Sequence, residues 1–285
     1  MTNYCDPTKR HDFVFLFDAT NSNPNGDPDN GNLPRIDPET MRGIVTDGCI
    51  KRKIRNWIDI VYGAEEHYKI YIQSKDALNT LHERAYTALN IKATRGKQKV
   101  EEIEAAKAWM RENFYDVRMF GAVMSTGDAS CGQARGPVQI AFAQSIDPIH
   151  QLNITITRMA VTKANEDKKQ EMGQKAIVPY GLYMGHGSFN PFFASGVSSG
   201  DLERFWEAFE SMWDMDKSAA RGDMNLRGLY VFTHDGPRGK THSYKLFDLV
   251  APVKKEDVKV ARSFNDYHKI KITKLPEGVI HTQLV

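Results

Sequence analysis

The chain has 285 residues, of which 41% are hydrophobic and 26% are charged, and its formal net charge at pH 7 is +2. No apolar run approaches the roughly 20 residues that a membrane-spanning helix needs, and no basic segment followed by an apolar one begins the chain, so neither a membrane span nor a secretory signal is expected. The three cysteines, Cys5, Cys49 and Cys131, are far apart and odd in number, which excludes a disulfide framework and a Cys-x-x-Cys metal knuckle and indicates a reducing cytoplasm.

The charges are unevenly distributed along the chain. Residues 42–55 contain five basic side chains and one acidic one, whereas residues 201–216 contain six acidic side chains and one basic one. A protein polarised in this way can hold a polyanion on one face at a modest total charge. Two solvated helix faces of opposite sign would give the same pattern, and composition leaves both interpretations open.

The N-terminal part predicts a strand, a turn-rich loop and a helix. Residues 11–17 are aromatic and β-branched and predict a buried strand. Residues 21–32 are a cluster of Asn, Pro, Gly and Asp, which indicates turns. A helix is expected from Pro38, with Asp37 as its N-cap, to Gly63. Its apolar residues recur at helical spacing, and Lys51, Arg52 and Arg55 fall largely off that stripe, so they are expected to project outward.

Residues 64–116 look like a helical insertion. Residues 77–89 and 100–114 are rich in Ala, Glu and Lys, which favour helix, and a loop at 94–98 separates them. Strand patterns return at 136–145 and 152–160. A polar segment follows, and a strand is again expected at 176–184, where Pro179 suggests an edge or a bulge.

The C-terminal part begins with an unambiguous amphipathic helix. From Leu202 to Trp213 apolar residues recur at positions i, i+3, i+4 and i+7, after the start signal Ser198-Ser-Gly-Asp201. A strand at 226–233 and a Gly-rich basic loop at 234–242 follow.

Without the insertions, the expected elements are β-α-β-β-α-β. This order predicts an α+β fold of the ferredoxin-like type, which RNA-recognition modules also use. Its sheet would have one face covered by the two helices and one face free for a ligand. We expect a single domain over residues 1–285, with excursions at 64–116 and 159–176.

Several stretches, spread through most of the chain, resemble one known family. The chain is similar to the backbone subunit of the CRISPR Cascade surveillance complex, the type I-C member of the CRISPR-associated "seven" family in the RAMP superfamily. The stretches that carry the resemblance are Asn23-Pro-Asn-Gly-Asp-Pro-Asp29, Val45-Thr-Asp-Gly-Cys-Ile-Lys-Arg-Lys-Ile-Arg55, Asp116-Val-Arg-Met-Phe-Gly121, Gly136-Pro-Val-Gln-Ile140, Ile156-Thr-Arg158 and Ile177-Val-Pro-Tyr-Gly-Leu-Tyr183.

The resemblance implies a hand-shaped molecule. It has an RNA-recognition-like palm, helical fingers at 64–116 and a β-hairpin thumb at 159–176, which would explain the polar segment between two strands. Copies would stack along the spacer of a guide crRNA and present it to a target DNA strand in antiviral defence. The implied partners are further copies of the chain, the 5′-cap subunit and the large subunit; no membrane, cofactor or catalytic residue is implied.

A protein that holds any spacer sequence should contact phosphates and riboses and leave the base edges free. The leading candidates for phosphate contact are Lys51, Lys53 and Arg55 on the first helix, with Arg35 and Arg42 at its entry. A solvated helix face remains the alternative.

Weaker candidates lie in three other regions. The stretch between the insertion and the sheet offers Arg118, Ser125, Gln133 and Arg135. The predicted thumb offers Arg158, Met159, Lys163, Met172 and Lys175, where the methionines could wedge between bases or pack at a subunit contact. The Gly-rich loop offers Arg238 and Lys240.

An enzyme is the alternative function. Asp27, Asp29 and Asp37 could hold Mg²⁺ for RNA cleavage, as an aspartate in a similar loop does in type III backbone subunits. Here the aspartates stand among Asn, Gly and Pro, which favours turn structure. The resemblance to type I-C subunits also implies that cleavage is delegated to another protein.

Overall fold

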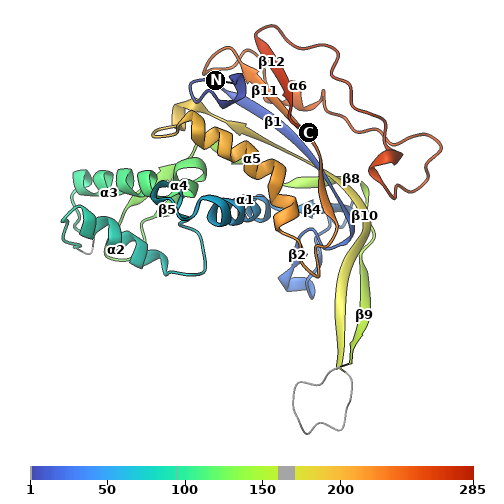
Figure 1. Cartoon of the computed structure of the whole chain (residues 1–285), viewed down its shortest axis with the longest axis horizontal. Coiled ribbons are helices and arrows are strands. Elements are labelled where there is room, and N and C mark those ends of the chain that lie inside the picture. Colours follow the sequence, from blue (N-terminus) through green and yellow to red (C-terminus); the bar gives the residue numbers. More distant parts are fainter. Residues whose placement is uncertain (1, 95, 160–170) are drawn as a thin grey trace.

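The computed structural model describes residues 2–94, 96–159 and 171–285, and it shows a mixed α/β protein built on a large antiparallel sheet (Figure 1). The sheet order is β12-β11-β1-β10-β8-β4, and β7 and β9 also pair with β10. Its strands are β1 (His11–Ser22), β4 (Arg42–Val45), β7 (Val138–Ile140), β8 (Ala143–Pro148), β9 (Leu152–Arg158), β10 (Glu171–Phe189), β11 (Met224–His234) and β12 (Val279–Gln283). Two small ladders add β2 (Gly26–Asp27) with β3 (Leu33–Pro34), and β5 (Gly121–Met124) with β6 (Gly132–Arg135). The helices are α1 (Asp47–Tyr62), α2 (Leu78–Ala88), α3 (Val100–Asn113), α4 (Tyr115–Phe120), α5 (Ser199–Met215) and α6 (Ser243–Phe247).

Strand β1 lies at the centre of the sheet and is buried on both faces. Its residues alternate: Phe13, Phe15 and Phe17 pack in one hydrophobic cluster with α1 and α5, whereas Val14 and Leu16 pack in another cluster on the opposite face. A strand with two covered faces needs apolar residues at consecutive positions, which explains the continuous run that predicted it.

Helix α1 begins later than expected. Thr46 caps it by accepting a hydrogen bond from the backbone N–H of Cys49, and Gly63 ends it as predicted. Asp37 caps a local turn instead, since its carboxylate accepts from the N–H of Glu39 and the hydroxyl of Thr40. The expected helix start at Pro38 is therefore wrong: residues 38–46 form a turn and the short strand β4.

Helix α5 matches its prediction closely. Ser198 and Asp201 form a capping box, in which each side chain accepts from the other residue's backbone N–H. The apolar stripe, including Phe205 and Phe209, is fully buried against β1 and α1. α1 and α5 thus cover one face of the sheet together (Figure 1).

The other face of the sheet is covered as well, which corrects the expectation of a free face. The segment from α6 to β12 crosses this face (Figure 1). Its Leu246, Val250 and Tyr267 pack in one cluster with Val14 and Leu16. A ligand therefore meets this segment and not the bare sheet.

The predicted insertion contains the two expected helices, α2 and α3. They pack with α4, β5 and β6 around a separate hydrophobic cluster that includes Leu81, Ala106 and Met110. This unit projects to the left of the sheet in Figure 1. It has its own small core, so it is a rigid projection and not a long loop.

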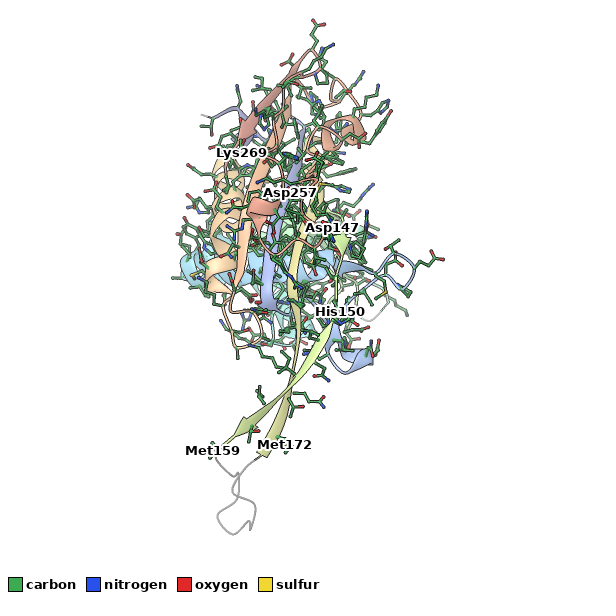
Figure 2. All side chains as sticks on the ribbon, turned by 90° about the vertical axis from the view of Figure 1, so that its right-hand side faces the viewer. Asp147, His150, Met159, Met172, Asp257 and Lys269 are labelled. Atoms are coloured by element: carbon green, nitrogen blue, oxygen red, sulfur yellow. The ribbon has the colours of Figure 1, made fainter. Side chains whose placement is uncertain are left out.

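Strands β9 and β10 form a hairpin that projects from the sheet. Their register runs from Leu152 opposite Ile177 to Arg158 opposite Glu171, and the hairpin extends away from the body of the molecule (Figures 1 and 2). Pro179 lies where β10 passes from β9 to the main sheet, and Asn21 of β1, at the same level, has φ +45°. Among the described residues, β9 pairs with β10 only up to Ile177 and β8 only from Tyr183, so the strand is locally unpaired on that side at Pro179, as the predicted edge requires. The register with β1 does not shift between Thr20 opposite Tyr180 and Ser22 opposite Val178, so the alternative of a bulge is wrong.

None of the helices in the described part of the chain has the length and apolar composition needed to cross a membrane. Cys5, Cys49 and Cys131 are free thiols, and Cys5 and Cys131 are buried.

Candidate nucleic-acid interface

Two of the three residues on α1 that were the leading candidates for phosphate contact form buried ion pairs within the protein. Lys53 is only 4% exposed; its ammonium contacts the carboxylate of Asp216 and lies 5.8 Å from the ring centre of Trp213. Arg55 Nε lies 2.8 Å from Oδ2 of Asp116, a carboxylate that is itself buried. The expected outward projection is therefore wrong for Arg55, and both cations are neutralised inside the protein.

The reason is that α1 is covered on more than its apolar stripe. Arg55 also stacks on Phe120 of α4, with 5.3 Å between the guanidinium carbon and the ring centre. Arg52 is half-buried, and its Nη1 donates to the carbonyl of Ile72 over 2.8 Å. Burial lowers the pKa of Arg52. Lys51 is half-buried too and pairs with Asp47 one turn earlier, 2.9 Å away. The Lys51 ammonium also lies 5.7 Å from the ring centre of Phe120.

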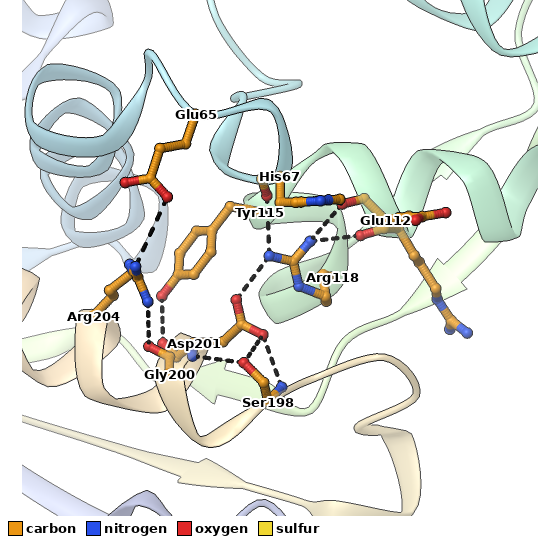
Figure 3. A network of polar contacts seen from close by, with 10 residues as sticks. Glu65, His67, Glu112, Tyr115, Arg118, Ser198, Gly200, Asp201 and Arg204 are labelled. Atoms are coloured by element: carbon orange, nitrogen blue, oxygen red, sulfur yellow. Dashed lines mark hydrogen bonds and ion pairs between the residues drawn. The ribbon is translucent and has the colours of Figure 1, made fainter. Parts of the chain in front are cut away.

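Arg118 holds the insertion to α5, and it lies in the wall of a recess of about 670 Å³ between α3 and the start of α5. One terminal nitrogen donates to the carbonyls of Arg111 and Glu112, and the other donates to the carbonyl of His67 and, over 2.7 Å, to Oδ1 of Asp201 (Figure 3). The side chain is 5% exposed, and both terminal nitrogens are engaged by partners within the protein. Its predicted role as a groove residue stays a prediction.

Asp201 is the centre of the network in Figure 3. Its Oδ2 accepts from the N–H and hydroxyl of Ser198, both at 2.8 Å, so one carboxylate caps α5 and anchors Arg118. The hydroxyl of Tyr115 donates to the Asp201 carbonyl over 3.0 Å, and burial, with the nearby carboxylate, raises the pKa of Tyr115 well above its usual value. The network is structural.

The candidates between the insertion and the sheet are exposed, apart from Arg118. Ser125 and Gln133 are exposed at the β5–β6 hairpin, and the exposed Arg135 lies over the ring of Phe193 at 4.1 Å. At the entry to α1, Arg42 is exposed, and Arg35 pairs with Asp27 at 3.2 Å. Of these cations, Arg42 and Arg135 make no ion pair with any residue that the structure describes.

A polar pocket of about 300 Å³ opens at the N-terminal end of α1. Amide side chains dominate its lining, and the half-buried Arg52 and Arg221 add cations. The amides come from Asn23, Asn25, Asn32 and Asn56. Amides and guanidinium groups at a helix N-terminus suit phosphate and ribose oxygens. This pocket is the best-defined polar recess on the side where α1 begins.

Sequence reasoning missed most of this pocket. It interpreted the asparagines of residues 21–32 only as turn formers, although Asn23, Asn25 and Asn32 also line the pocket. No signal pointed to Arg221, which is isolated in the sequence and reaches the pocket because the loop after α5 folds back beside β1. The Nε of Arg221 also pairs with Asp216 at 2.7 Å.

The projecting hairpin carries exposed apolar side chains near its end. Met159 is 77% exposed and Met172 is 81% exposed (Figure 2). Ile154 and Ile156 on β9 are also exposed, and Lys175, opposite Ile154, is half-buried. Lys163 and the side chain of Arg158 lie outside the described residues.

The remaining candidates lie in loops. Arg238 and Lys240 are exposed in the Gly-rich loop, where the backbone N–H of Lys240 donates to the buried His234. In the acidic loop, Asp27 accepts from the N–H of Asp29 at 3.4 Å besides pairing with Arg35. The carboxylate of Asp27 is thus engaged by a turn N–H and by Arg35, and that of Asp37 by a turn N–H and a hydroxyl.

The model of the family described as CRISPR-associated protein Cas7 matches residues 9–273. A protein of that description from Haloferax volcanii is 26% identical over 230 residues, which cover 71% of this chain and 64% of the relative's length. Two solved structures titled as CRISPR RNA-guided surveillance complexes, one of them pre-nicking, contain chains with 15% and 14% sequence identity and a TM-score of 0.49 each. They cover 78% and 88% of this chain, and 75% and 78% of their own chains.

Proposed function

Because the chain belongs to the CRISPR-associated Cas7 family, we propose that it is a guide-RNA-binding backbone subunit of a CRISPR surveillance complex. Copies assemble along the spacer of a crRNA and present it to a target DNA strand. The motifs of the sequence favour the type I-C complex, with its 5′-cap and large subunits as partners. Free thiols in the chain fit a cytoplasmic location.

The connectivity of the sheet supports an RNA-recognition-like palm. Strands β11, β1, β10 and β8 are neighbours in this order, and α1 and α5 connect them on one face, as in a ferredoxin-like fold. The unit of α2 and α3 would be the fingers and the β9–β10 hairpin the thumb. The guide would lie on the side between them, at the polar pocket where α1 begins.

The observation that carries the proposal is the hairpin with its exposed methionines. In the described part of the chain nothing covers Met159 or Met172. An apolar side chain at the end of a projecting hairpin gains stability only by packing on another molecule, and it can separate stacked bases. A neighbouring copy and its RNA supply both.

Replacing Met159 and Met172 by Ser tests this role. The free energy of unfolding should change by less than about 0.5 kcal/mol, since exposed substitutions rarely do more. On a long RNA, the double variant should form shorter assemblies than the wild type in light scattering. Met215→Ser on α5, also exposed, serves as the control and should assemble normally. Normal assembly of the double variant would remove the hairpin from the contact between copies.

We further propose that the subunit is not catalytic. The carboxylates of Asp27 and Asp37 are engaged in turns, which supports a structural role. Incubation of the assembled protein with Mg²⁺ and complementary RNA should give no cut product. Cleavage at regular intervals that Asp27→Ala abolishes would instead establish the alternative, a metal-dependent endoribonuclease that uses Asp27, Asp29 and Asp37.

A further inference from the structure

A second recess lies on the other side of the hairpin base. This cavity of about 650 Å³ is enclosed by the end of β8, the start of β9, part of β10 and the C-terminal segment. Asp147 and His150, which line it, lie on the side that faces the viewer in Figure 2, opposite to the fingers of Figure 1. The cavity is thus separate from the pocket at the start of α1.

One carboxylate fixes the wall of the cavity. Lys254 Nζ lies 3.0 Å from Oδ1 of Asp147, and the hydroxyl of Tyr267 donates to Oδ2 over 2.6 Å. Burial and this carboxylate raise the pKa of Tyr267 far above its usual value. The contacts clamp the C-terminal segment to the hairpin base, and they neutralise Asp147 within the wall.

Two further cations line the same cavity and have no such partner. The exposed side chains of Lys259 and Arg262 make no ion pair or hydrogen bond with any residue in the described ranges. With Lys254 and Asp147, the lining thus has three permanent cations and one carboxylate. An uncompensated charge in a recess concentrates anions there, because the protein walls focus the field.

The surroundings strengthen this field. Residues 251–275 contain seven Lys or Arg and three Asp or Glu. On the helix-covered side of the sheet, α5 exposes four carboxylates at helical spacing: Glu203, Glu207, Glu210 and Asp214. A polyanion is therefore repelled from α5 and attracted to the C-terminal segment.

The charged groups of the lining suit the sugar–phosphate backbone of a nucleic acid. A guanidinium and an ammonium bind phosphate oxygens well. Tyr180 and Tyr267 are buried and offer no open face on which a base could stack, and His150 is the exposed ring of the lining. Contact through phosphate alone is independent of sequence, as a backbone subunit requires.

We propose that this cavity, through Lys259 and Arg262, binds backbone phosphates of a nucleic-acid strand outside the guide segment held at α1. The proposal rests on the proposed function. The phosphates belong either to the part of the guide that passes to an adjacent copy or to a second strand paired with the guide.

The test compares Lys259→Ala/Arg262→Ala with the wild type in salt titrations of nucleic-acid binding. Two lost contacts to a single strand should reduce the slope of log K against log salt by about 1.4. Binding is measured for an RNA that spans one copy, for a long RNA on which copies assemble, and for a complementary DNA added to that assembly. A change with the long RNA alone identifies the guide, and a change with the complementary strand identifies the second strand.

Lys92→Ala/Lys97→Ala, which removes two exposed lysines from the loop between α2 and α3, is the matched control. Its slopes should change less than those of the cavity variant. Equal changes, or unchanged slopes for the cavity variant on the long RNA and the complementary strand, would overturn the proposal. So would poor assembly with unchanged slopes, which would make the cavity a contact with the acidic α5 of another copy.

A small polyanion tests the cavity independently of the proposed function, because its binding does not require assembly on RNA. Sodium tripolyphosphate should raise the melting temperature of the wild type more than that of the cavity variant, whether or not the protein assembles on RNA. Failure of the wild type to bind RNA would contradict the proposed function alone. Equal stabilisation of both proteins by tripolyphosphate would contradict the cavity site.

Discussion

The cations of α1 and those of the C-terminal segment look alike in the sequence but behave differently in the structure. Lys53 and Arg55 are buried and ion-paired, whereas Lys259 and Arg262 are exposed and pair with no described residue. The difference depends on carboxylates that are remote in sequence. Asp116 and Asp216 come to α1 from α4 and from the end of α5. A cluster of basic residues in the sequence therefore gives unpaired surface cations only where the fold brings no carboxylate to it.

The largest effect should come from breaking a buried pair. Arg55→Ala leaves the Asp116 carboxylate buried, although the N–H groups of Tyr71 and Ile72 still donate to it. An uncompensated buried charge costs about 3–5 kcal/mol. Urea unfolding should show a loss of this order, whereas Arg42→Ala, which removes an exposed arginine, should stay within about 0.5 kcal/mol. Equal stability of the two variants would mean that the α1 cations do not support the fold.

A smaller loss of stability is expected when acid protonates His11, a buried histidine whose ring makes no ion pair with any described residue. His11 is bonded to the hydroxyl of Thr233 and the carbonyl of Asp6, and burial lowers its pKa to about 4. Between pH 6.5 and about 4, His11 binds a proton in the unfolded chain but not in the folded protein. The free energy of unfolding therefore decreases as the pH is lowered from 6.5 to about 4. The loss should be about 3 kcal/mol.

The difference between the wild type and His11→Gln isolates this contribution. Urea unfolding of both at pH 7 and pH 4.5 should show a smaller acid loss for the variant, since it has no group that gains a proton in this range. The same acid loss in both proteins would show that His11 is not the residue responsible.

The smallest effect concerns Arg42, an exposed cation at the proposed guide surface. Arg42→Ala should reduce the slope of log K against log salt by about 0.7 for single-stranded RNA of any sequence. Arg84→Ala, in which the lost cation pairs with Asp76 on the fingers at 3.4 Å, is the control. If both variants have the wild-type slope, β4 is not part of the guide surface.

Local patterns predicted the helices and strands well, and long-range pairing explains what they missed. The apolar stripe of α5 and the apolar run of β1 were sufficient to predict these two elements, because each packs against a covered surface. The covering of the second sheet face was not predictable, since Leu246 and Val250 form a single i, i+4 pair and Tyr267 lies far from them in the chain. Thr46 was missed as the cap of α1 because Asp37 and Pro38 gave a stronger start signal.

The residues of the candidate site also fall into those that local sequence could predict and those that depend on long-range contacts. The exposed methionines of the hairpin could be predicted from a resemblance and from the polar segment between them. The burial of Arg118 could not, because Asp201 lies 83 residues away in the chain. The lining of the pocket at the start of α1 combines two separate loops with the helix, and no short motif contains that information.

The central claim is that this chain assembles in several copies along RNA. The most direct measurement is the mass of the purified protein by light scattering, with and without nuclease treatment. The account predicts particles far above the 32.3 kDa of one chain that contain RNA protected from nuclease. A monomer that carries no RNA, and stays monomeric when a long RNA is added, would contradict it.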